Sequence, residues 1–172
     1  MTALESPAEI VRGLFLDSLL FLRVLPVRPM SLLDIGAGAG IPGLPLRLAD
    51  DRIALTLVES RRKRVSFLLA ACRELSLPDV RVLEGRAEEV IPGNPQLAAA
   101  FDAVVARAVG GVGLVASIGD HFVRPGGVVV VAGSPGSTDT QGFEALRVAV
   151  PGSGISRVFL RKRKESNVPR ET

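Results

Sequence analysis

The sequence predicts a single α/β domain in which a mostly parallel central sheet is covered by helices on both faces. Short apolar runs alternate with segments of helical spacing from Ser31 to about Ala132, as in strand–helix–strand units with right-handed crossovers. The predicted strands are apolar along most of their length, which is typical of strands buried on both faces. At 172 residues, of which 47% are hydrophobic, the chain suits one compact domain with one sizeable core.

The first predicted element is a helix, because an apolar run follows Pro7 and continues to Leu25, where Pro26 ends it. Short β-rich runs bounded by turn residues then predict strands over residues 31–35, 53–58, 80–83, 101–106 and 128–132. Between them, apolar residues at helical spacing predict helices over residues 42–49, 61–75 and 112–122. Residues 85–100 are predicted to form a turn and helical pieces interrupted by Pro92 and Pro95.

The segment after Gly133 is less regular. A loop to Gly142, a short helix and one strand near residues 155–160 are predicted there, without a sixth and seventh strand pair. The single domain, residues 1–172, is therefore expected to consist of an N-terminal helix (1–29), a ligand-binding core (30–133) and a variable C-terminal segment (134–172).

The composition favours a cytoplasmic protein. A net charge of +3 and a pI of about 9.7 permit a nucleic acid or another acidic partner without requiring one. Cys72 is the only cysteine, so no disulfide forms within the chain and a reducing compartment is expected. Glu5 and Glu9 stand where a secretory signal carries positive charge, and the apolar stretch 13–22 is too short to span a membrane. Cys72 and His121 are expected to be structural residues within helices, and no spacing of metal ligands is found.

The most informative residues form a glycine-rich turn after the first predicted strand. Open α/β sheets bind nucleotide-like ligands at this place, where residues without a Cβ let the backbone turn tightly and approach the ligand. The glycines fall at Gly36, Gly38 and Gly40, whereas the dinucleotide fingerprint would need a glycine in place of Ile41. Together with Asp34, this spacing resembles the first motif of the Rossmann-like S-adenosylmethionine-dependent methyltransferases. That cofactor has no pyrophosphate and carries a positive sulfonium, which suits an acid at the strand end.

Two further positions fit the same ligand. Glu59 ends the second strand 19 residues beyond Gly40, and an acid there is able to accept both ribose hydroxyls. The alternative is a solvent-facing acid that pairs with the basic residues 61–64. Ala87 and Glu88 follow the third strand, where an adenine would lie, although such a pair also marks an ordinary helix start.

Together these segments resemble one family, the bacterial methyltransferases that act on guanine N7 of small-subunit ribosomal RNA, also called glucose-inhibited division protein B. The resemblance covers roughly residues 15–133. Its motifs are FLDSL at 15–19, DIG at 34–36, IPG at 41–43, ES at 59–60, KR at 63–64, FL at 67–68, GRAE at 85–88, FD at 101–102, RA at 107–108 and PGG at 125–127. The resemblance implies that S-adenosylmethionine is the cofactor and that ribosomal RNA or the small ribosomal subunit is the partner.

The resemblance also implies which residues contact the cofactor. The family's contact positions match Gly36, Ile41, Ala87, Glu88 and Arg107. With the residues proposed above, the predicted cofactor site consists of Asp34, Gly36, Gly38, Gly40, Ile41, Glu59, Ala87, Glu88 and Arg107.

The sequence departs from the family pattern in three places. Leu14 stands where family members usually carry a histidine, and Ala132 stands where they usually carry a lysine. The additional helical turns with which they begin are not found before Leu14. These departures leave two alternatives open, a catalytically silent homologue that binds the cofactor as a binding or regulatory module, and a small-molecule methyltransferase.

Methylation of guanine N7 needs no general base, because the lone pair of N7 is already free. The enzyme has to hold the nucleophile in line with the methyl group and exclude water. The one candidate catalytic residue is Arg107, which would contact the cofactor or lie against the target base. The alternative is a structural salt bridge from Arg107 to Asp34 or Asp102.

Two basic clusters are candidate contacts for RNA phosphates, residues 61–64 and Arg157 with residues 161–164. The alternative is that both are solvated surface. The chain has no Trp or Tyr, and its seven Phe residues are expected to be mostly buried, which leaves few platforms for base stacking.

Overall fold

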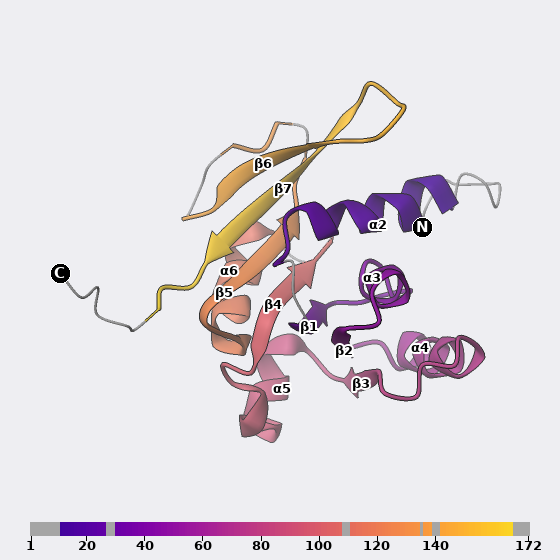
Figure 1. Ribbon diagram of the computed structural model, residues 1–172. Helices are drawn as coiled ribbons and strands as arrows, with labels where there is room; N and C mark the ends of the chain where they lie inside the picture. The colour runs from indigo at the N-terminus through magenta and orange to yellow at the C-terminus, as the bar shows by residue number, and fades with distance from the viewer. Residues whose placement is uncertain (1–10, 27–29, 108–110, 135, 139–141, 167–172) are drawn as a thin grey trace.

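The computed structural model describes residues 11–26, 30–107, 111–134, 136–138 and 142–166. Its seven strands form one sheet in the order β3-β2-β1-β4-β5-β7-β6. The strands are β1 (Met30–Ile35), β2 (Ile53–Glu59), β3 (Arg81–Glu84), β4 (Phe101–Ala106), β5 (Val123–Ala132), β6 (Glu144–Ala149) and β7 (Ser156–Arg163). Strands β1 to β5 are parallel, whereas β7 is antiparallel to both β5 and β6. The mostly parallel sheet predicted from the alternation of apolar runs is confirmed (Figure 1).

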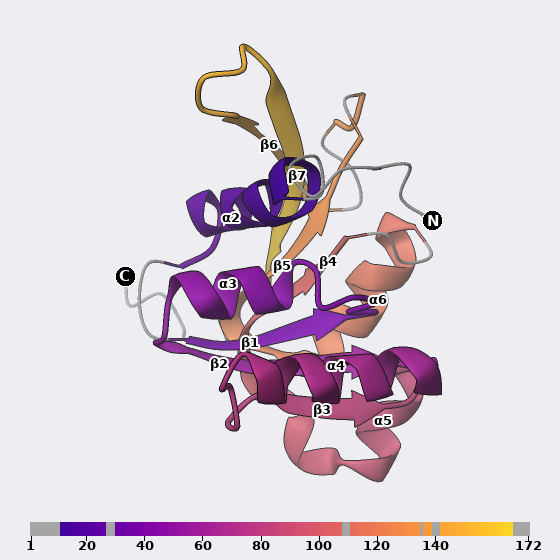
Figure 2. The same ribbon diagram turned by 90° about the vertical axis from the view of Figure 1, so that its right-hand side faces the viewer.

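Helices cover both faces of this sheet, as predicted. On one face lie α3 (Gly43–Ala49), α4 (Arg62–Glu74) and the N-terminal helical segment, which consists of η1 (Val11–Leu16), α2 (Asp17–Leu19) and η2 (Leu20–Arg23). The other face is covered by α5 (Ala87–Gly93), η3 (Pro95–Leu97) and α6 (Val112–Phe122). Figures 1 and 2 show the two layers of helices on opposite sides of the strands.

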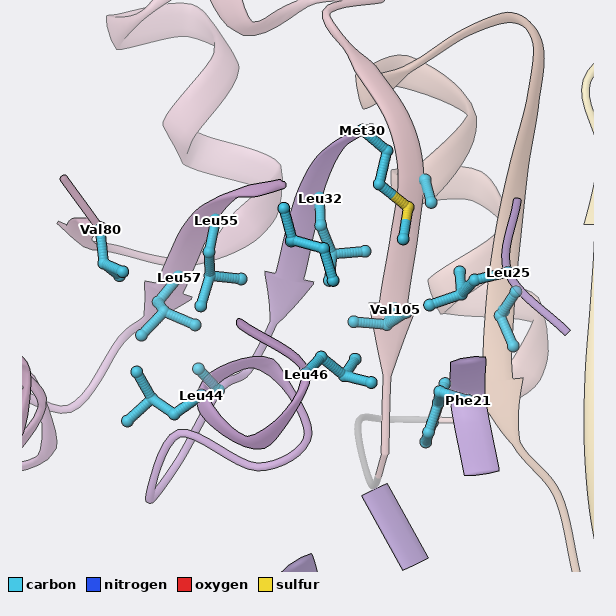
Figure 3. Close-up of a cluster of buried hydrophobic side chains, with 14 of the residues drawn as sticks. Phe21, Leu25, Met30, Leu32, Leu44, Leu46, Leu55, Leu57, Val80 and Val105 are labelled. Atoms are coloured by element: carbon cyan, nitrogen blue, oxygen red, sulfur yellow. The ribbon is translucent and has the colours of Figure 1, made fainter. Parts of the chain in front are cut away.

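The two cores follow from the alternation of side chains along the central strands. Leu32 of β1 faces the α3 layer, whereas Leu33, the next residue, faces the α6 layer. Figure 3 shows Leu44 and Leu46 of α3 against the apolar side chains of β1, β2 and β4. The N-terminal helical segment is held by Phe21, whose ring lies edge-to-face on that of Phe159 in β7, with centroids 4.7 Å apart.

Several predicted bounds agree closely with the structure. Strand β4 and helix α6 cover the residues predicted for them, β1, β2 and α3 differ by one residue at one end, and α4 differs by one residue at each end. Cys72 is buried in α4, as expected of a structural residue. His121 also lies within a helix, in the last turn of α6, but its side chain is exposed. Within the predicted N-terminal segment 1–29, residues 1–10 and 27–29 lie outside the described residues.

The prediction for the start of the fifth strand was wrong. The strand predicted over residues 128–132 begins earlier, at Val123, so the turn-favouring residues Pro125 and Gly126 lie inside β5. The pairing of β4 with β5 is irregular between Phe101 and Ala103, and Gly126 has a φ of +79°. A strand accommodates proline and glycine at such an irregularity.

The prediction for the C-terminal segment was correct for the strand near residues 155–160, which is β7, and wrong for the residues before it. Residues 144–149 form a strand, β6, which pairs with β7, so a sixth and seventh strand pair is present. The residues of β6 are Glu-Ala-Leu-Arg-Val-Ala, and the first four favour a helix. Pairing with β7 overrides this local preference, because an edge strand gains backbone hydrogen bonds from its neighbour. Among the described residues, no helix is long and apolar enough to cross a membrane.

Candidate functional site

The glycine turn lies at the carboxyl end of β1 and is held by backbone hydrogen bonds. The N–H groups of Gly36 and Ala37 both donate to the carbonyl oxygen of Val58 in β2, at 2.9 and 3.0 Å. Gly36, Gly38 and Gly40 have φ values of +69°, +60° and +83°, which residues with a Cβ rarely adopt. A Cβ on Gly40 would also lie 2.4 Å from Cδ1 of Leu44. The turn therefore depends on these glycines for its shape.

Asp34 supports this turn from below. Its side chain is buried, and its Oδ2 accepts a hydrogen bond of 2.9 Å from the N–H of Gly43, at the start of α3. Burial raises the pKa of Asp34 to about 7, which the hydrogen bond from Gly43 opposes and the negative charge of Glu59 reinforces. The carboxylate does not line the cleft described below, so the structure places Asp34 behind the turn.

Glu59 ends β2 and is 4% exposed. Its Oε2 accepts a hydrogen bond of 2.9 Å from the N–H of Gly38, and its Oε1 accepts one of 2.8 Å from the N–H of Arg61. Nη1 of Arg64 lies 3.6 Å from the same carboxylate. The acid therefore pairs with one of the basic residues but is buried rather than solvent-facing. A carboxylate has about four acceptor positions, so both oxygens retain capacity for further donors such as ribose hydroxyls.

Two hollows border the glycine turn, and because Gly36 lines both of them, they are together called the cleft. A hollow of about 290 Å³ is lined by Gly36, Ser60 and the segment after β3, including Ala87 and Glu88. A larger hollow of about 740 Å³ is lined by residues of the turn and of the surrounding elements: Leu14, Gly36, Ala37, Gly38, Ala39, Ile41, Arg61, Arg64, Phe67 and Arg107. Six of the predicted residues thus meet on the walls of this cleft: Gly36, Gly38, Ile41, Ala87, Glu88 and Arg107. Asp34, Gly40 and Glu59 do not line it and instead hold the turn.

Arg107 follows the last residue of β4 and borders the larger hollow. Its Nη2 donates a hydrogen bond of 3.0 Å to the carbonyl oxygen of Gly13. Its Nη1 is buried and has no hydrogen-bond partner among the described residues. Asp102 lies near the opposite end of β4, where it pairs with Arg124, and Asp34 points toward Gly43. Arg107 therefore contacts neither acid, and its Nη1 is a buried donor without a partner at the border of the larger hollow.

The two basic clusters differ sharply in the structure. In the C-terminal cluster, Arg161 pairs with Glu144, and Lys162 pairs with Asp120. The Lys164 ammonium donates to the carbonyl oxygens of Asp120 and Val123. These cations stabilise β7 rather than extend into solvent. By contrast, residues 61–64 are all exposed, and Arg61 and Arg64 line the cleft.

Five of the seven phenylalanines are buried, as expected, and one of the two exposed ones, Phe67, lies at the cleft. It is 53% exposed on α4 and lines the larger hollow, between the turn and the basic residues. The buried positions of α4 are Val65, Leu68 and Cys72, at the spacing of one helical face. Phe67 lies outside that face, so a stricter use of the helical period would have predicted its exposure.

The described residues contain no group of three or more His, Cys, Asp or Glu residues able to hold a metal ion.

The strand order and the glycine turn define the class of the S-adenosylmethionine-dependent methyltransferases. Solved structures share this fold. An S-adenosylmethionine-dependent methyltransferase from Aquifex aeolicus superposes with a TM-score of 0.63 at 13% identity, covering 93% of this chain and 94% of that one. A precorrin-6y C5,15-methyltransferase from Geobacter metallireducens gives a TM-score of 0.61 at 16% identity, covering 96% and 93%.

The chain belongs to the family described as rRNA small subunit methyltransferase G, which matches residues 1–162. It is 31% identical to the ribosomal RNA small subunit methyltransferase G of Dictyoglomus thermophilum, over 98% of this chain and 75% of that protein. The protein of the same name from Sorangium cellulosum is 41% identical, over 76% of this chain and 55% of that one. That from Moorella thermoacetica is 35% identical, over 92% and 66%. The family suggested by the sequence motifs is confirmed.

Proposed function

We propose that this protein transfers a methyl group from S-adenosylmethionine to N7 of a guanine in small-subunit ribosomal RNA. The observation that carries this proposal is the cleft around the glycine turn. In a chain of the matching family, this cleft is lined by the backbone of Gly36 and Gly38 and by Arg107, and the buried acid Glu59 beside it holds Gly38.

The residues of the cleft fit the parts of this cofactor. The hollow beside Ala87 and Glu88 suits the adenine, because it offers apolar walls and polar groups along one edge. Glu59 would accept the ribose hydroxyls while it still holds Gly38. Gly36, Ile41 and Arg107, at the larger hollow, would hold the methionine portion. The free Nη1 donor of Arg107 suits the carboxylate of that portion.

The reaction requires little acid–base chemistry from the protein. When bound, S-adenosylmethionine supplies a methyl group whose carbon bonds to the N7 lone pair as its bond to sulfur breaks, leaving the electron pair on sulfur. No proton has to leave N7, so the cleft needs no base beside the acceptor. The contribution of the chain is to hold the acceptor in line and exclude water, which the walls formed by Leu14, Ile41 and Arg107 are placed to do.

An RNA acceptor suits the surface around the cleft. Arg61, Arg62 and Lys63 are exposed and form no ion pair among the described contacts, and they begin the helix that follows Glu59. Phe67 adds an exposed aromatic ring beside them. Cations with an interleaved aromatic ring are the combination that binds the backbone and bases of single-stranded RNA. An rRNA substrate also agrees with a cytoplasmic location.

The test is transfer of a labelled methyl group to small ribosomal subunits and to naked small-subunit RNA, followed by mass spectrometry of the digested RNA. The expected product is 7-methylguanosine. S-adenosylmethionine and its demethylated product should raise the melting temperature, whereas NAD should not, because a ligand of the native state stabilises it. Binding of the cofactor without transfer to either RNA would support the silent homologue instead. Stabilisation by NAD alone would overturn the cofactor assignment.

A further inference from the structure

A second pocket lies next to the cofactor cleft and shares Arg107 with it. Its volume is about 330 Å³, which is within the range of small-ligand sites. It is lined by Asp17, Phe21, Arg107, Ala132, Gly133, Ser156, Arg157, Val158 and Phe159. Arg107 follows β4 and Ala132 ends β5, so the pocket opens at the carboxyl ends of the parallel strands. Ligands of open α/β sheets bind at that edge.

The pocket joins an apolar side to a charged side. The apolar side is formed by the rings of Phe21 and Phe159, both buried, and the small residues Ala132 and Gly133 leave room beside them. The charged side is an ion pair in which Nε of Arg157 donates to Oδ2 of Asp17, at 2.8 Å. The Asp17 side chain is 15% exposed and that of Arg157 is 41% exposed. A flat, partly polar ring fits such a pocket.

We propose that this pocket receives the acceptor guanine, with Asp17 as the residue that recognises it. This inference rests on the proposed function and assigns the base-binding part of the same site. Along its Watson–Crick edge, guanine presents the O6 acceptor followed by the N1–H and N2–H donors. The Asp17 carboxylate accepts from both donors, as a charge-assisted pair. Arg157, beside that carboxylate, holds it in place and donates to O6.

The same arrangement excludes adenine. Adenine presents a donor at N6 and an acceptor at N1, so its N1 lone pair would face the Asp17 carboxylate. An acceptor against an anion is repulsive, and the N6 donor would meet the guanidinium of Arg157. The pocket therefore selects guanine both by attraction and by rejection of the other purine.

The charge of Asp17 also suits the reaction. Methylation at N7 leaves the guanine ring with a positive charge, which makes N1–H a stronger donor. A carboxylate at N1–H therefore binds the ring more tightly as the methyl group is transferred than before it. An interaction that strengthens toward the transition state raises the rate as well as the affinity.

The test compares guanine with inosine at the acceptor position of a synthetic small-subunit RNA fragment, because inosine lacks only the N2 amino group. The wild-type protein should show a kcat/KM about tenfold lower for inosine, since one hydrogen bond to a charged group is worth about one factor of ten. Binding of the two fragments in the presence of S-adenosylhomocysteine, followed by fluorescence anisotropy, should show the same preference. This second readout does not depend on methyl transfer.

Two variants separate recognition from structure. Asp17→Ala should remove the preference, so that the two fragments are bound and methylated alike. Arg157→Ala breaks the same ion pair but leaves Asp17 as the acceptor for N2–H. It should therefore weaken the binding of both fragments and keep the ratio of their affinities. Asp17→Leu, which has a similar shape but no acceptor, replaces Asp17→Ala if that variant does not fold. Neither variant should change the affinity for S-adenosylhomocysteine.

The outcomes distinguish this inference from the proposed function. Equal kcat/KM for the two fragments in the wild-type protein, or the same change of ratio in both variants, would overturn the role of Asp17 while methyl transfer to guanine stands. If the wild-type protein neither binds nor methylates either fragment, the proposed function fails, and the inference fails with it.

Discussion

Glu59 and Gly38 are 21 residues apart in the sequence, yet Oε2 of Glu59 lies 2.9 Å from the backbone nitrogen of Gly38 and accepts its hydrogen bond. The glycine turn after β1 is thereby tied to the end of β2. The acid expected to bind the ribose thus also holds the backbone that approaches the cofactor. The two functions meet in one buried carboxylate.

Replacing Glu59 by Gln should weaken the binding of S-adenosylmethionine by about 1–3 kcal/mol, the range for losing a charged hydrogen-bond partner. Calorimetric titration would measure this change. The matched control is Glu84→Gln. Glu84 is an exposed residue of β3 that pairs in register with Glu59 of β2. Equal affinities for both variants and the wild type would show that Glu59 does not contact the cofactor.

Replacing Gly40 by Ala should destabilise the fold more than replacing Gly126 by Ala. Both glycines have a positive φ, of +83° and +79°, so both variants carry a similar backbone strain of about 1–2 kcal/mol. Only at Gly40 does the added Cβ meet neighbouring atoms, with Cδ1 of Leu44 at 2.4 Å. Overpacking should add a further ~1–3 kcal/mol, measurable by urea denaturation. Similar losses of stability in the two variants would contradict this packing of the turn.

Asp34 should make the stability of the protein depend on pH. Its pKa rises from 3.8 in the unfolded chain to about 7 in the folded one, because burial disfavours the charged carboxylate. Between these values the folded state holds a proton that the unfolded state has lost. The contribution of Asp34 to stability is therefore largest below about pH 4, falls as the pH rises toward 7, and is constant above it. At about 1.36 kcal/mol per pKa unit, the loss is at most about 4 kcal/mol.

Asp34→Asn keeps an acceptor for the N–H of Gly43 and removes the titration. Its stability should therefore change less than that of the wild type between pH 4 and 7, with the difference read from urea denaturation at a series of pH values. Parallel curves for the two proteins would show that the carboxylate is not buried as described.

Reversing Arg62 and Lys63 to Glu should weaken RNA binding and flatten its dependence on salt. Each phosphate of a single strand that the protein no longer neutralises lowers the salt slope by about 0.7. The affinity for the cofactor should stay close to that of the wild type. Reversal of Arg73 and Arg81 makes the same change of charge at exposed positions near the amino ends of the strands, away from the cleft. An equal effect of the two double variants would indicate a general charge effect rather than a binding surface.

Replacing Phe67 by Ala should lower RNA affinity by about 1–3 kcal/mol if one base stacks on its ring. Stability should change little, because the ring is 53% exposed. Leu69 on the same helix is 47% exposed and does not line the cleft, so Leu69→Ala is the control. Gel-shift or anisotropy measurements would detect the difference, and equal affinities in the two variants would exclude stacking on Phe67.

Local patterns were sufficient to predict the part of the fold that carries the site. The apolar runs of β1, β2 and β4 and the helical spacing of α6 are encoded within each segment, and their bounds agree with the structure to within one residue. The glycine turn was also predictable, because the need for positive φ at Gly36, Gly38 and Gly40 is a property of the residue itself.

Local patterns failed where a partner strand decides the conformation. Residues 144–149 favour a helix by composition, yet they form β6 because β7 supplies backbone donors and acceptors along one edge. Pro125 and Gly126 indicate a turn by themselves, yet they lie in β5 because the strand pairs on either side of them. No property of the segment alone shows that such a partner is present.

The sequence by itself determined the order of strands and helices from β1 to β5, the glycine turn and the family. Only the tertiary structure decided what each charged group does. In the folded chain, Asp34 accepts a hydrogen bond from the N–H of Gly43, and the C-terminal cations pair with acids and carbonyl oxygens. Residues 61–64, by contrast, are exposed at the cleft. The fold also brings Asp17 and Arg157, 140 residues apart, to one pocket. Hydrogen bonds and ion pairs act over a few ångströms, so their partners are set by how the chain packs and not by neighbours in the sequence.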